Sequence, residues 1–468
     1  MATIIEQNPL YDILPVGQEV IFTVSEATIV STQTKVKFIA NVYISDDTIV
    51  TGSSTPIGTF KTTPNNAGVG IFDFRPVIEN FVGSDNMAGI GSPYKIHITS
   101  ATSEFPIHII DKLSTNTNSV RYLVIIFNVE YLDTTTNTIV TGVSAESDEY
   151  TLFNGYIKHD DTILRGSPNN FGYNLEKFEL DTNLGEFLTN APTTQYANKS
   201  DYGTIAVMAN PANSSLLNTI DYISFTYTEH DGSTTTENFD NDDANGGYTT
   251  YSADTKNQIL FIGCYPANIR NRSSVFRALI TAGDVSHYTV TAYNSTDDAI
   301  SDTLTININC PTLKGYEPIR LTWLNQWGAW DYYTFNMKST KTISTKGSTY
   351  QQLGGSWNSS LYNPYGYKGG KKAFRVNAME KISMNTDFVN ESESALFEEL
   401  INSPEVYLLN GYYHESELAQ LVSIVPSKYV KPVRLITSSY TKKTIANDKL
   451  MQYTFEVEKS RTLRTQSI

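Results

Sequence analysis

The stretch KVKFIANVYI, residues 35–44, places an apolar side chain at every second position. Successive side chains of an extended strand point to opposite sides of a sheet, so this spacing predicts a strand with one buried face. The side chains expected on that face are Val36, Phe38, Ala40, Val42 and Ile44. The stretch therefore indicates one layer of a β-sheet core.

The same period of two recurs along the whole chain. It is found in IDYISFTYTEH (220–230), TLTININ (303–309) and MQYTFEVE (451–458). Residues 121–131, RYLVIIFNVEY, are apolar almost throughout and predict a central strand that is covered on both faces. Clusters of Thr, Ser, Asn, Asp and Gly separate these stretches, as is typical between the strands of β-sandwiches. We expect a mainly β protein of tandem antiparallel β-sandwich-like domains with a few short helices.

Length and punctuation predict three domains. A chain of 468 residues corresponds to about three domains of roughly 150 residues each. The pattern changes near residue 150, and Pro and Gly residues punctuate the chain near residue 312. We therefore expect an N-terminal β domain (1–150), a middle β domain (151–312) and a C-terminal β domain (313–468) with a tryptophan-rich hairpin and one short helix.

Helical patterns are scarce. The best candidate is NESESALFEEL (390–400), in which Asn390 can cap the first turn and Glu393 occupies the third helical position. Two shorter apolar stretches, at 76–80 and 185–190, are each expected to form a single helical turn.

The composition excludes several classes of protein. With 34 Lys and Arg against 49 Asp and Glu the net charge is -15, and an acidic surface repels nucleic-acid phosphates. No apolar run approaches the roughly 18 residues of a membrane-spanning helix, and the first residues lack the basic and apolar regions of a signal peptide. We expect no specific nucleic-acid binding, no membrane insertion and synthesis in a cytoplasm. Cys264 and Cys310 are expected to be buried thiols, with one disulfide between them as the alternative.

Charge is distributed unevenly along the chain. Residues 313–468 contain 19 Lys and Arg and 14 Asp and Glu, a net charge of +5, which leaves -20 for residues 1–312. Two interpretations stay open: identical chains pack acidic surface against basic surface, or the unequal surfaces simply face solvent. The candidate basic contacts lie in a Gly-rich loop and are Lys368, Lys371, Lys372 and Arg375.

No pattern points to catalysis, a cofactor or a metal. There is no Gly-x-Ser-x-Gly motif, the six His are scattered singly, and no zinc-binding spacing occurs. The segment GYKGGKK (366–372) lacks the spacing and the Ser or Thr of a phosphate-binding loop. The acidic loop 240–247 has Ser252 where a calcium loop requires a bidentate Glu, so we expect a solvated loop. A carboxylate pair such as glycoside hydrolases use, far apart in sequence, stays an open alternative.

Three of the four tryptophans lie in residues 319–337, IRLTWLNQWGAWDYYTFNM. This segment predicts a hairpin whose first strand ends at Leu324 and whose second strand begins at Trp330. Residues 325–328 can form a type I turn in which Gly328 adopts a left-handed conformation.

The aromatic side chains of this hairpin have two possible uses. In the structural one, Trp323 and Trp330 anchor the core of the C-terminal domain, Trp327 is exposed at the turn, and Asp331 accepts hydrogen bonds from the turn amides. In the other, the aromatic rings form an exposed platform that binds sugar. The alternation and the turn residues favour the structural hairpin.

The hairpin resembles a signature of phage tail proteins. Residues 323–335, WLNQWGAWDYYTF, are similar to the pattern W-L-N-x-x-G-x-x-D-x-Y/F-x-F of tail and tail-adjacent structural proteins in tailed phages that infect Bacteroidota and marine bacteria, including crAss-like phages. The residues assigned to this assembly or structural signature are Trp323, Leu324, Asn325, Gly328, Trp330, Asp331 and Phe335. Further segments that fit the same family, in order, are 71–82, 122–131, 186–208, 397–409 and 447–460.

The resemblance implies a β-rich structural protein of the virion tail without catalytic residues. Such a protein assembles with itself, as a ring or adaptor around the tail, and binds neighbouring tail subunits. A receptor- or glycan-binding tail protein is the first alternative. A polysaccharide depolymerase is the second, although the sequence shows no short repeat of the kind that parallel β-helices require.

Overall fold

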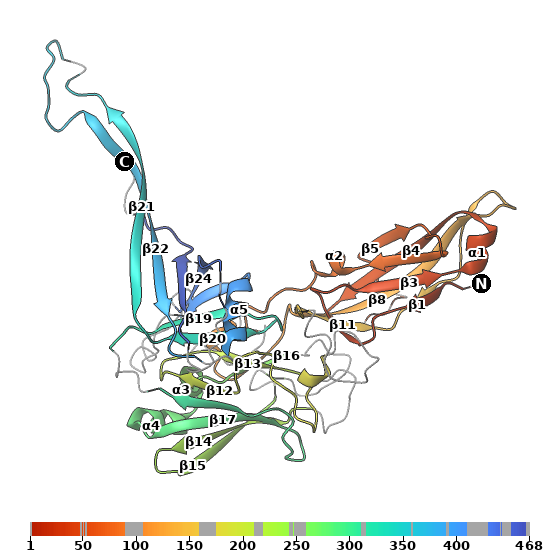
Figure 1. Cartoon of the computed structure of the whole chain (residues 1–468), viewed down its shortest axis with the longest axis horizontal. Helices are drawn as coiled ribbons and strands as arrows, with labels where there is room; N and C mark the ends of the chain where they lie inside the picture. Colours follow the sequence, from red (N-terminus) through yellow and green to blue (C-terminus); the bar gives the residue numbers. More distant parts are fainter. Residues whose placement is uncertain are drawn as a thin grey trace. The chain divides into compact units, whose positions relative to one another are not determined.

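The computed structural model is mainly β, with 47% of residues in strands and 11% in helices (Figure 1). This confirms the expected fold class of β-sandwich-like domains with a few short helices. The structure describes residues 2–46, 49, 51, 54–88, 106–158, 175–209, 219–242, 247, 259–309, 315–356, 359–389, 393–409, 429–439, 441 and 451–464.

The chain forms two compact units, each of which contains more than one segment. Unit 1 consists of Met1–Cys310, Leu324–Asp331 and Tyr412–Pro426. Unit 2 consists of Pro311–Trp323, Tyr332–Gly411 and Ser427–Ile468. The division into three domains at residues 150 and 312 stays a prediction.

The first part of unit 1 is a β-sandwich. One layer contains, in this order, β1 (Ile4–Gln7), β3 (Ile21–Ser25) and β6 (Val69–Asp73). The other contains β2 (Ile13–Pro15), β11 (Tyr150–Phe153), β8 (Val120–Leu132), β4 (Thr34–Ser45) and β5 (Gly58–Thr62), with β9 (Ile139–Thr141) and β10 (Ala145–Glu146) also paired to β8. Its pairings are antiparallel apart from the parallel β2–β11 pair. The helices are α1 (Ala27–Thr32) and α2 (Arg75–Ile78).

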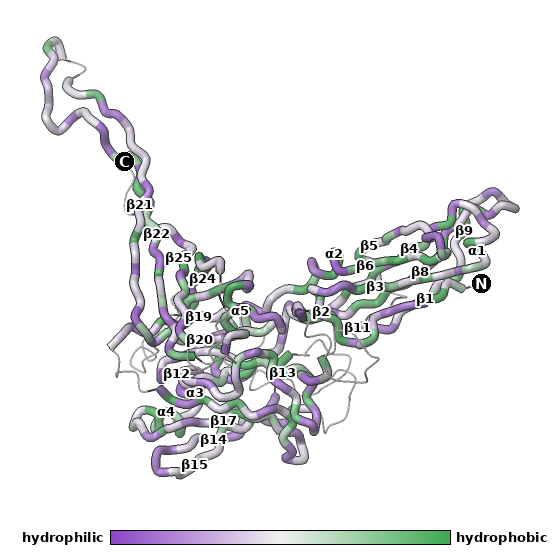
Figure 2. The backbone as a smooth tube through the Cα atoms, viewed as in Figure 1, coloured by the Kyte–Doolittle hydropathy of each residue, from purple (hydrophilic) through white to green (hydrophobic). Residues whose placement is uncertain are grey.

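The two layers of the sandwich share one apolar core. Phe22 of β3 and Phe72 of β6 both pack on Phe127 of β8, with ring centroids 5.5 and 5.7 Å apart. Phe38, Ala40 and Val42, three of the side chains expected on the buried face of β4, belong to this core. Figure 2 shows the hydrophobic positions that recur along β3, β4 and β8. The pattern with a period of two is confirmed for Phe38, Ala40 and Val42 of β4, and β3 and β6 likewise bury every second residue.

The rest of unit 1 contains two more sheets. The smaller has the order β13 (Thr204–Met208), β16 (Ile259–Gly263) and β7 (Leu113–Thr115). The larger has the order β12 (Thr194–Ala197), β18 (Leu304–Ile308), β17 (Val285–Tyr293), β14 (Tyr222–Glu229) and β15 (Thr234–Asp240), with β12 and β18 parallel. Two single-turn 3-10 helices are η1 (Ile107–Ile109) and η3 (Glu176–Phe178).

Two consecutive helices cover the larger of these sheets. They are α3 (Pro266–Arg272) and α4 (Ser274–Ala282). Phe276 of α4 lies 4.8 Å from the ring of Tyr227 in β14 and 5.5 Å from that of Tyr288 in β17. All three side chains are fully buried, so this contact forms the core between the helix and the sheet.

Unit 2 is built on one seven-stranded sheet. Its order is β20 (Trp330–Phe335), β19 (Ile319–Leu324), β23 (Val406–Leu409), β24 (Val430–Leu435), β25 (Thr454–Lys459), β22 (Gly370–Asn385) and β21 (Ser339–Gln352). Phe397 of α5 (Ser394–Asn402) packs on Phe455 of β25, with ring centroids 5.4 Å apart. Strands β21 and β22 continue as a two-stranded ribbon beyond the residues of β22 that pair with β25 (Figure 1).

The expected helices are confirmed only in part. The turn at 76–80 corresponds to α2, and α5 has its predicted apolar face, with Leu396 and Leu400 buried. Helix α5 begins at Ser394, so Glu393 is its N-cap instead of its third residue, while Asn390 lies outside the described residues. The helical turn expected at 185–190 is wrong. Leu188 there donates its backbone N–H to Ala206 of β13, which gives the segment an extended-chain partner in place of a helical one.

Candidate functional site

The tryptophan turn, Leu324–Asp331, has its backbone fixed by one side chain. The amide oxygen of Asn325 accepts hydrogen bonds from the backbone N–H groups of Trp327 and Ala329, both at 3.0 Å. Its Nδ2 donates to the carbonyl oxygen of Leu188 at 2.9 Å. The side chain of Asn325 thus satisfies the turn internally and attaches it to unit 1. The expectation that Asp331 accepts hydrogen bonds from the turn amides is wrong. The N–H groups of Trp327 and Ala329 donate to Asn325 instead.

Gly328 is required in the turn for two independent reasons. Its φ of 71° lies in the left-handed region that favours glycine. A Cβ at this position would also lie 1.9 Å from the backbone carbonyl oxygen of Asn154. The strand end at Leu324, the left-handed Gly328 and the strand start at Trp330 all agree with the sequence-based prediction.

Trp327 is buried in unit 1. Only 3% of its surface is exposed, its Nε1 donates to the Oδ1 of Asn190 at 3.1 Å, and its ring lies 4.5 Å from that of Phe178. The expectation that Trp327 is exposed is therefore wrong. A turn tip is usually solvated, but here tertiary packing around Phe178 covers it.

Trp330 and Asp331 also belong to unit 1. Trp330 donates from Nε1 to the carbonyl oxygen of Asp85 at 2.9 Å, and its ring meets the ring of His108 at 4.8 Å. Asp331 accepts a hydrogen bond from the hydroxyl of Thr189. Trp330 was expected in the C-terminal core, and this is wrong, because its hydrogen bond and its ring contact are both to residues of unit 1.

The other signature residues lie in unit 2. Trp323 is fully buried there, as expected, and Phe335 contacts Phe455 with ring centroids 5.9 Å apart. The signature therefore contains the positions at which the chain passes from unit 2 into unit 1 and back. None of its three tryptophans is an exposed platform.

The second candidate is the arm, which we define as residues 346–377 of the β21–β22 ribbon. Pairs run from Lys346–Asn377 to Gln352–Gly370, and Phe374 is the extra residue of a bulge between Ser348 and Thr349. Gly355 is the only buried residue among those of the arm that the structure describes. The large apolar side chains that are exposed on it are Leu353, Leu361, Tyr362, Tyr365, Tyr367, Phe374 and Val376.

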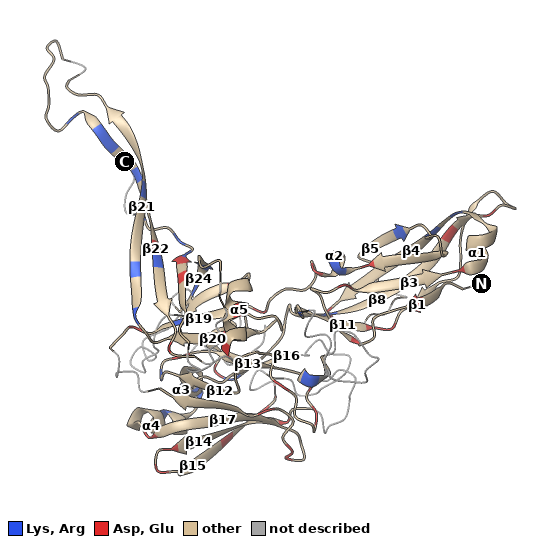
Figure 3. Ribbon diagram, in the orientation of Figure 1, with Lys and Arg blue, Asp and Glu red and all other residues tan. Residues whose placement is uncertain are grey.

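The arm carries charge of one sign only. It contains five basic residues, Lys346, Lys368, Lys371, Lys372 and Arg375, and no Asp or Glu (Figure 3). The ammonium of Lys368 lies 5.2 Å from the ring of Tyr365 and 5.7 Å from that of Tyr367. Lys372 donates to the carbonyl oxygen of Tyr367 at 3.0 Å. The structure thus brings the four predicted basic residues together on one exposed ribbon.

Two ionisable side chains that the sequence did not single out, Arg272 and the buried Asp111, lie near each other in unit 1. Arg272 donates to the carbonyl oxygens of Asp111 and Gly263 at 2.8 and 2.9 Å, and its guanidinium lies 4.1 Å from the ring of Phe225. Burial raises the pKa of Asp111 from 3.8 to about 7, although hydrogen bonding by Asn271 and the nearby Arg272 oppose the rise. Burial likewise lowers the pKa of Arg272. Nothing in the spacing of these residues signals their contact, because Arg272 ends helix α3 and Asp111 lies in a loop far away in sequence.

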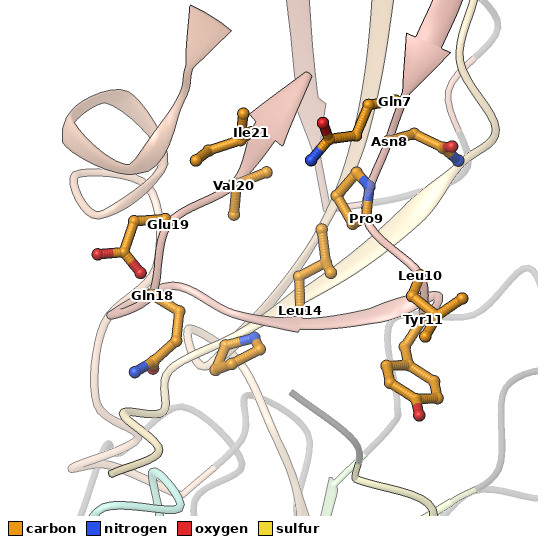
Figure 4. A pocket seen from close by; sticks show the side chains of 11 residues that line it. Gln7, Asn8, Pro9, Leu10, Tyr11, Leu14, Gln18, Glu19, Val20 and Ile21 are labelled. Atoms are coloured by element: carbon orange, nitrogen blue, oxygen red, sulfur yellow. The ribbon is translucent and has the colours of Figure 1, made fainter. Parts of the chain in front are cut away.

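An open pocket of about 380 Å³ lies at the start of the chain (Figure 4). Residues 7–21 supply its walls. Asn8 donates to the hydroxyl of Tyr150 at 2.7 Å, and both ends of the Gln18 amide bond to the backbone of Ile157. These hydrogen bonds hold two of the polar side chains of the pocket to the protein itself.

Other expected features are located as follows. No group of His, Cys, Asp and Glu suited to a metal ion occurs among the residues that the structure describes. Asn241 of the acidic loop donates its side-chain amide to the carbonyl oxygen of Ile220, while 243–246 lie outside the description. Cys264 is buried, and Cys310 falls among the undescribed residues.

No model of a known protein family matches the chain, and no curated protein matches it significantly. In the described part of the chain, every helix is too short or too polar to span a lipid bilayer.

Proposed function

We propose that the chain is a non-enzymatic structural protein of a phage tail that assembles with itself, as a ring or adaptor, and with neighbouring tail subunits. The observation that carries this proposal is the arm. A two-stranded ribbon with both faces in solvent is marginally stable by itself, and this one exposes seven large apolar side chains. Exposed apolar groups beside unpaired charge are typical of a surface that binds another protein.

The sequence of the tryptophan turn supports the same proposal. Its residues carry the resemblance to tail proteins, and the hydrogen bonds of Asn325 and Trp330 explain why those residue types are needed at those positions. A turn that stabilises the fold in this way is what we expect in a structural protein. Location in the virion tail follows from the resemblance and is part of the proposal.

Glycan or receptor binding is the second candidate function. The observation in its favour is the pair of exposed rings of Tyr365 and Tyr367, whose centroids lie 5.7 Å apart. Aromatic faces of this kind stack on sugar rings. The site for this function is the arm tip, since the tryptophans of the turn are buried.

Light scattering and electron microscopy of the purified chain test the proposal. We expect an oligomer that grows with concentration and closed rings or regular arcs in the images. A glycan array and incubation with bacterial polysaccharides serve as the functional controls. A chain that stays monomeric at all concentrations and binds a glycan through Tyr365 and Tyr367 would contradict it and favour the second function.

A further inference from the structure

The five-stranded sheet of unit 1, with the order β12, β18, β17, β14 and β15, has a charge pattern opposite to that of the arm. We call β14, β15, β17 and β18 with their turns, residues 221–242 and 283–309, the acidic sheet. These residues include ten Asp and Glu and no Lys or Arg (Figure 3). Many of the acids are exposed, among them Asp221 before β14 and Asp284 before β17.

The acidic sheet also has an edge that can receive another chain. Among the residues that the structure describes, β15 is the last strand of its sheet and pairs with β14 only. The exposed side chains of β15 are polar or acidic, so a partner that binds here must itself be polar and positively charged. The arm is such a partner, and within the described part of the chain no other strand pairs with its outer edges.

We propose that the arm of one copy binds the acidic sheet of a neighbouring copy. The inference rests on the proposed function in one respect, self-assembly, and adds to it the two surfaces that meet. Charge complementarity is its basis: the arm has five cations and no acid, and the strands and turns of the acidic sheet have ten acids and no Lys or Arg of their own. Two cations of neighbouring segments, Lys112 and Arg272, lie over the ring of Phe239 in β15. The apolar side chains of the arm favour a protein surface over a phosphate backbone, and the net charge of -15 opposes approach to nucleic acid.

Zero-length cross-linking locates the contact. A carbodiimide joins Lys directly to Asp or Glu, so a mixture of isotope-labelled and unlabelled chains separates links between copies from links within one copy. We expect Lys368, Lys371 and Lys372 to be linked between copies to acids of 221–242 or 283–309. Links from these lysines that occur only within one copy, or only to other regions, overturn the inference.

Charge substitution measures how much the contact contributes. Replacing Lys368, Lys371, Lys372 and Arg375 with Gln removes four positive charges from the arm. We expect the concentration needed for half-assembly to rise about tenfold or more, since several exposed pairs are lost together. The matched control variant removes four positive charges outside the arm. Its substitutions, all at exposed residues, are Lys35→Gln, Lys37→Gln, Arg461→Gln and Arg464→Gln. An equal effect of both variants overturns the inference.

A charge exchange separates this contact from general repulsion. The pair Lys371→Glu and Arg375→Glu should weaken assembly, and so should the pair Asp221→Lys and Asp284→Lys. A chain that carries all four substitutions should assemble again. If the chain with all four substitutions does not assemble, the inference is overturned. The proposed function then still stands, provided that the native chain forms rings. A native chain that never assembles overturns both. Salt-sensitive binding of the arm to duplex DNA, in place of the second copy, also overturns the inference.

Discussion

The tryptophan turn and the arm are both β-hairpins of the last third of the chain, yet their environments are opposite. In the turn, Asn325 satisfies the backbone while Trp327 and Trp330 donate their indole N–H groups to partners in unit 1. In the arm, side chains face solvent on both sides of the ribbon. The turn contains one Asp and no cation, whereas the arm contains five cations and no acid.

This difference shows which residues suit a hairpin that packs within its own chain and which suit a hairpin that binds another chain. A buried hairpin must bring partners for its own polar groups, because an unpaired polar group in the interior costs roughly 1–3 kcal/mol. Asn325, Trp327 and Trp330 do this with directed hydrogen bonds, whereas the indole N–H of Trp323, in the adjoining strand, has no hydrogen-bond partner among the described residues. Lys and Tyr on the arm keep polar ends in water and leave long apolar stems available. Stability should therefore depend on the turn, and association on the arm.

The largest effect is expected for Trp330→Ala. Removal of the ring leaves a cavity beside His108 and an unpaired carbonyl oxygen at Asp85, so the free energy of unfolding of unit 1 should fall by about 3–5 kcal/mol. Chemical denaturation followed by circular dichroism measures this. Tyr362→Ala, in the arm, is the matched control and should change the free energy of unfolding by less than about 0.5 kcal/mol. Equal losses for both variants would remove the distinction between the two hairpins.

A change of pH tests the buried interior of unit 1. The folded state holds the pKa of Asp111 at about 7, above its ordinary 3.8, so it retains a proton that the unfolded chain loses. This contribution to stability is complete below pH 4 and is lost as the pH rises toward 7, by up to about 4 kcal/mol.

Asp111→Asn isolates this group from the other carboxylates. The variant cannot ionise, so its stability relative to the native chain should increase between pH 4 and pH 7. Urea titrations at a series of pH values measure the difference. A difference that stays constant with pH would show that Asp111 keeps an ordinary pKa.

A backbone effect should follow from Gly328→Ala. The left-handed φ costs a non-glycine residue about 1 kcal/mol, and the new Cβ would collide with the carbonyl oxygen of Asn154. Together these should destabilise unit 1 by about 2–4 kcal/mol. Gly366→Ala in the arm is the control, because its φ is not left-handed and a Cβ there meets nothing within 4 Å. Thermal melting that shifts equally for both glycines would contradict this account of the turn.

The sequence predicted local structure better than it predicted burial. Alternating patterns located β4, β14, β18 and β25, and turn residues located the bounds of the tryptophan hairpin. These features depend on neighbours in the chain. The burial of Trp327 depends on Phe178 and Asn190, which no local pattern reveals.

Helices α3 and α4 were missed although α4 carried a readable signal. Ser273 caps it by accepting a hydrogen bond from the N–H of Phe276, and Gly283 ends it in a left-handed conformation. Each helix is short, and Ser273 separates the two, so their apolar residues do not make one long helical pattern. The basic residues of the arm were predicted individually, but the long strands that present them were not. Lys371 and Lys372 lie in β22 and not in the expected loop.

The most direct test is to remove the arm. Gly347 and Val376 are paired across the ribbon, so replacing residues 348–375 with Asn-Gly closes the shortened hairpin with a two-residue turn. We expect a chain that melts at nearly the native temperature and stays monomeric, by light scattering, at concentrations where the full chain assembles. An arm-less chain that assembles like the full chain would contradict the account, and so would one that no longer folds.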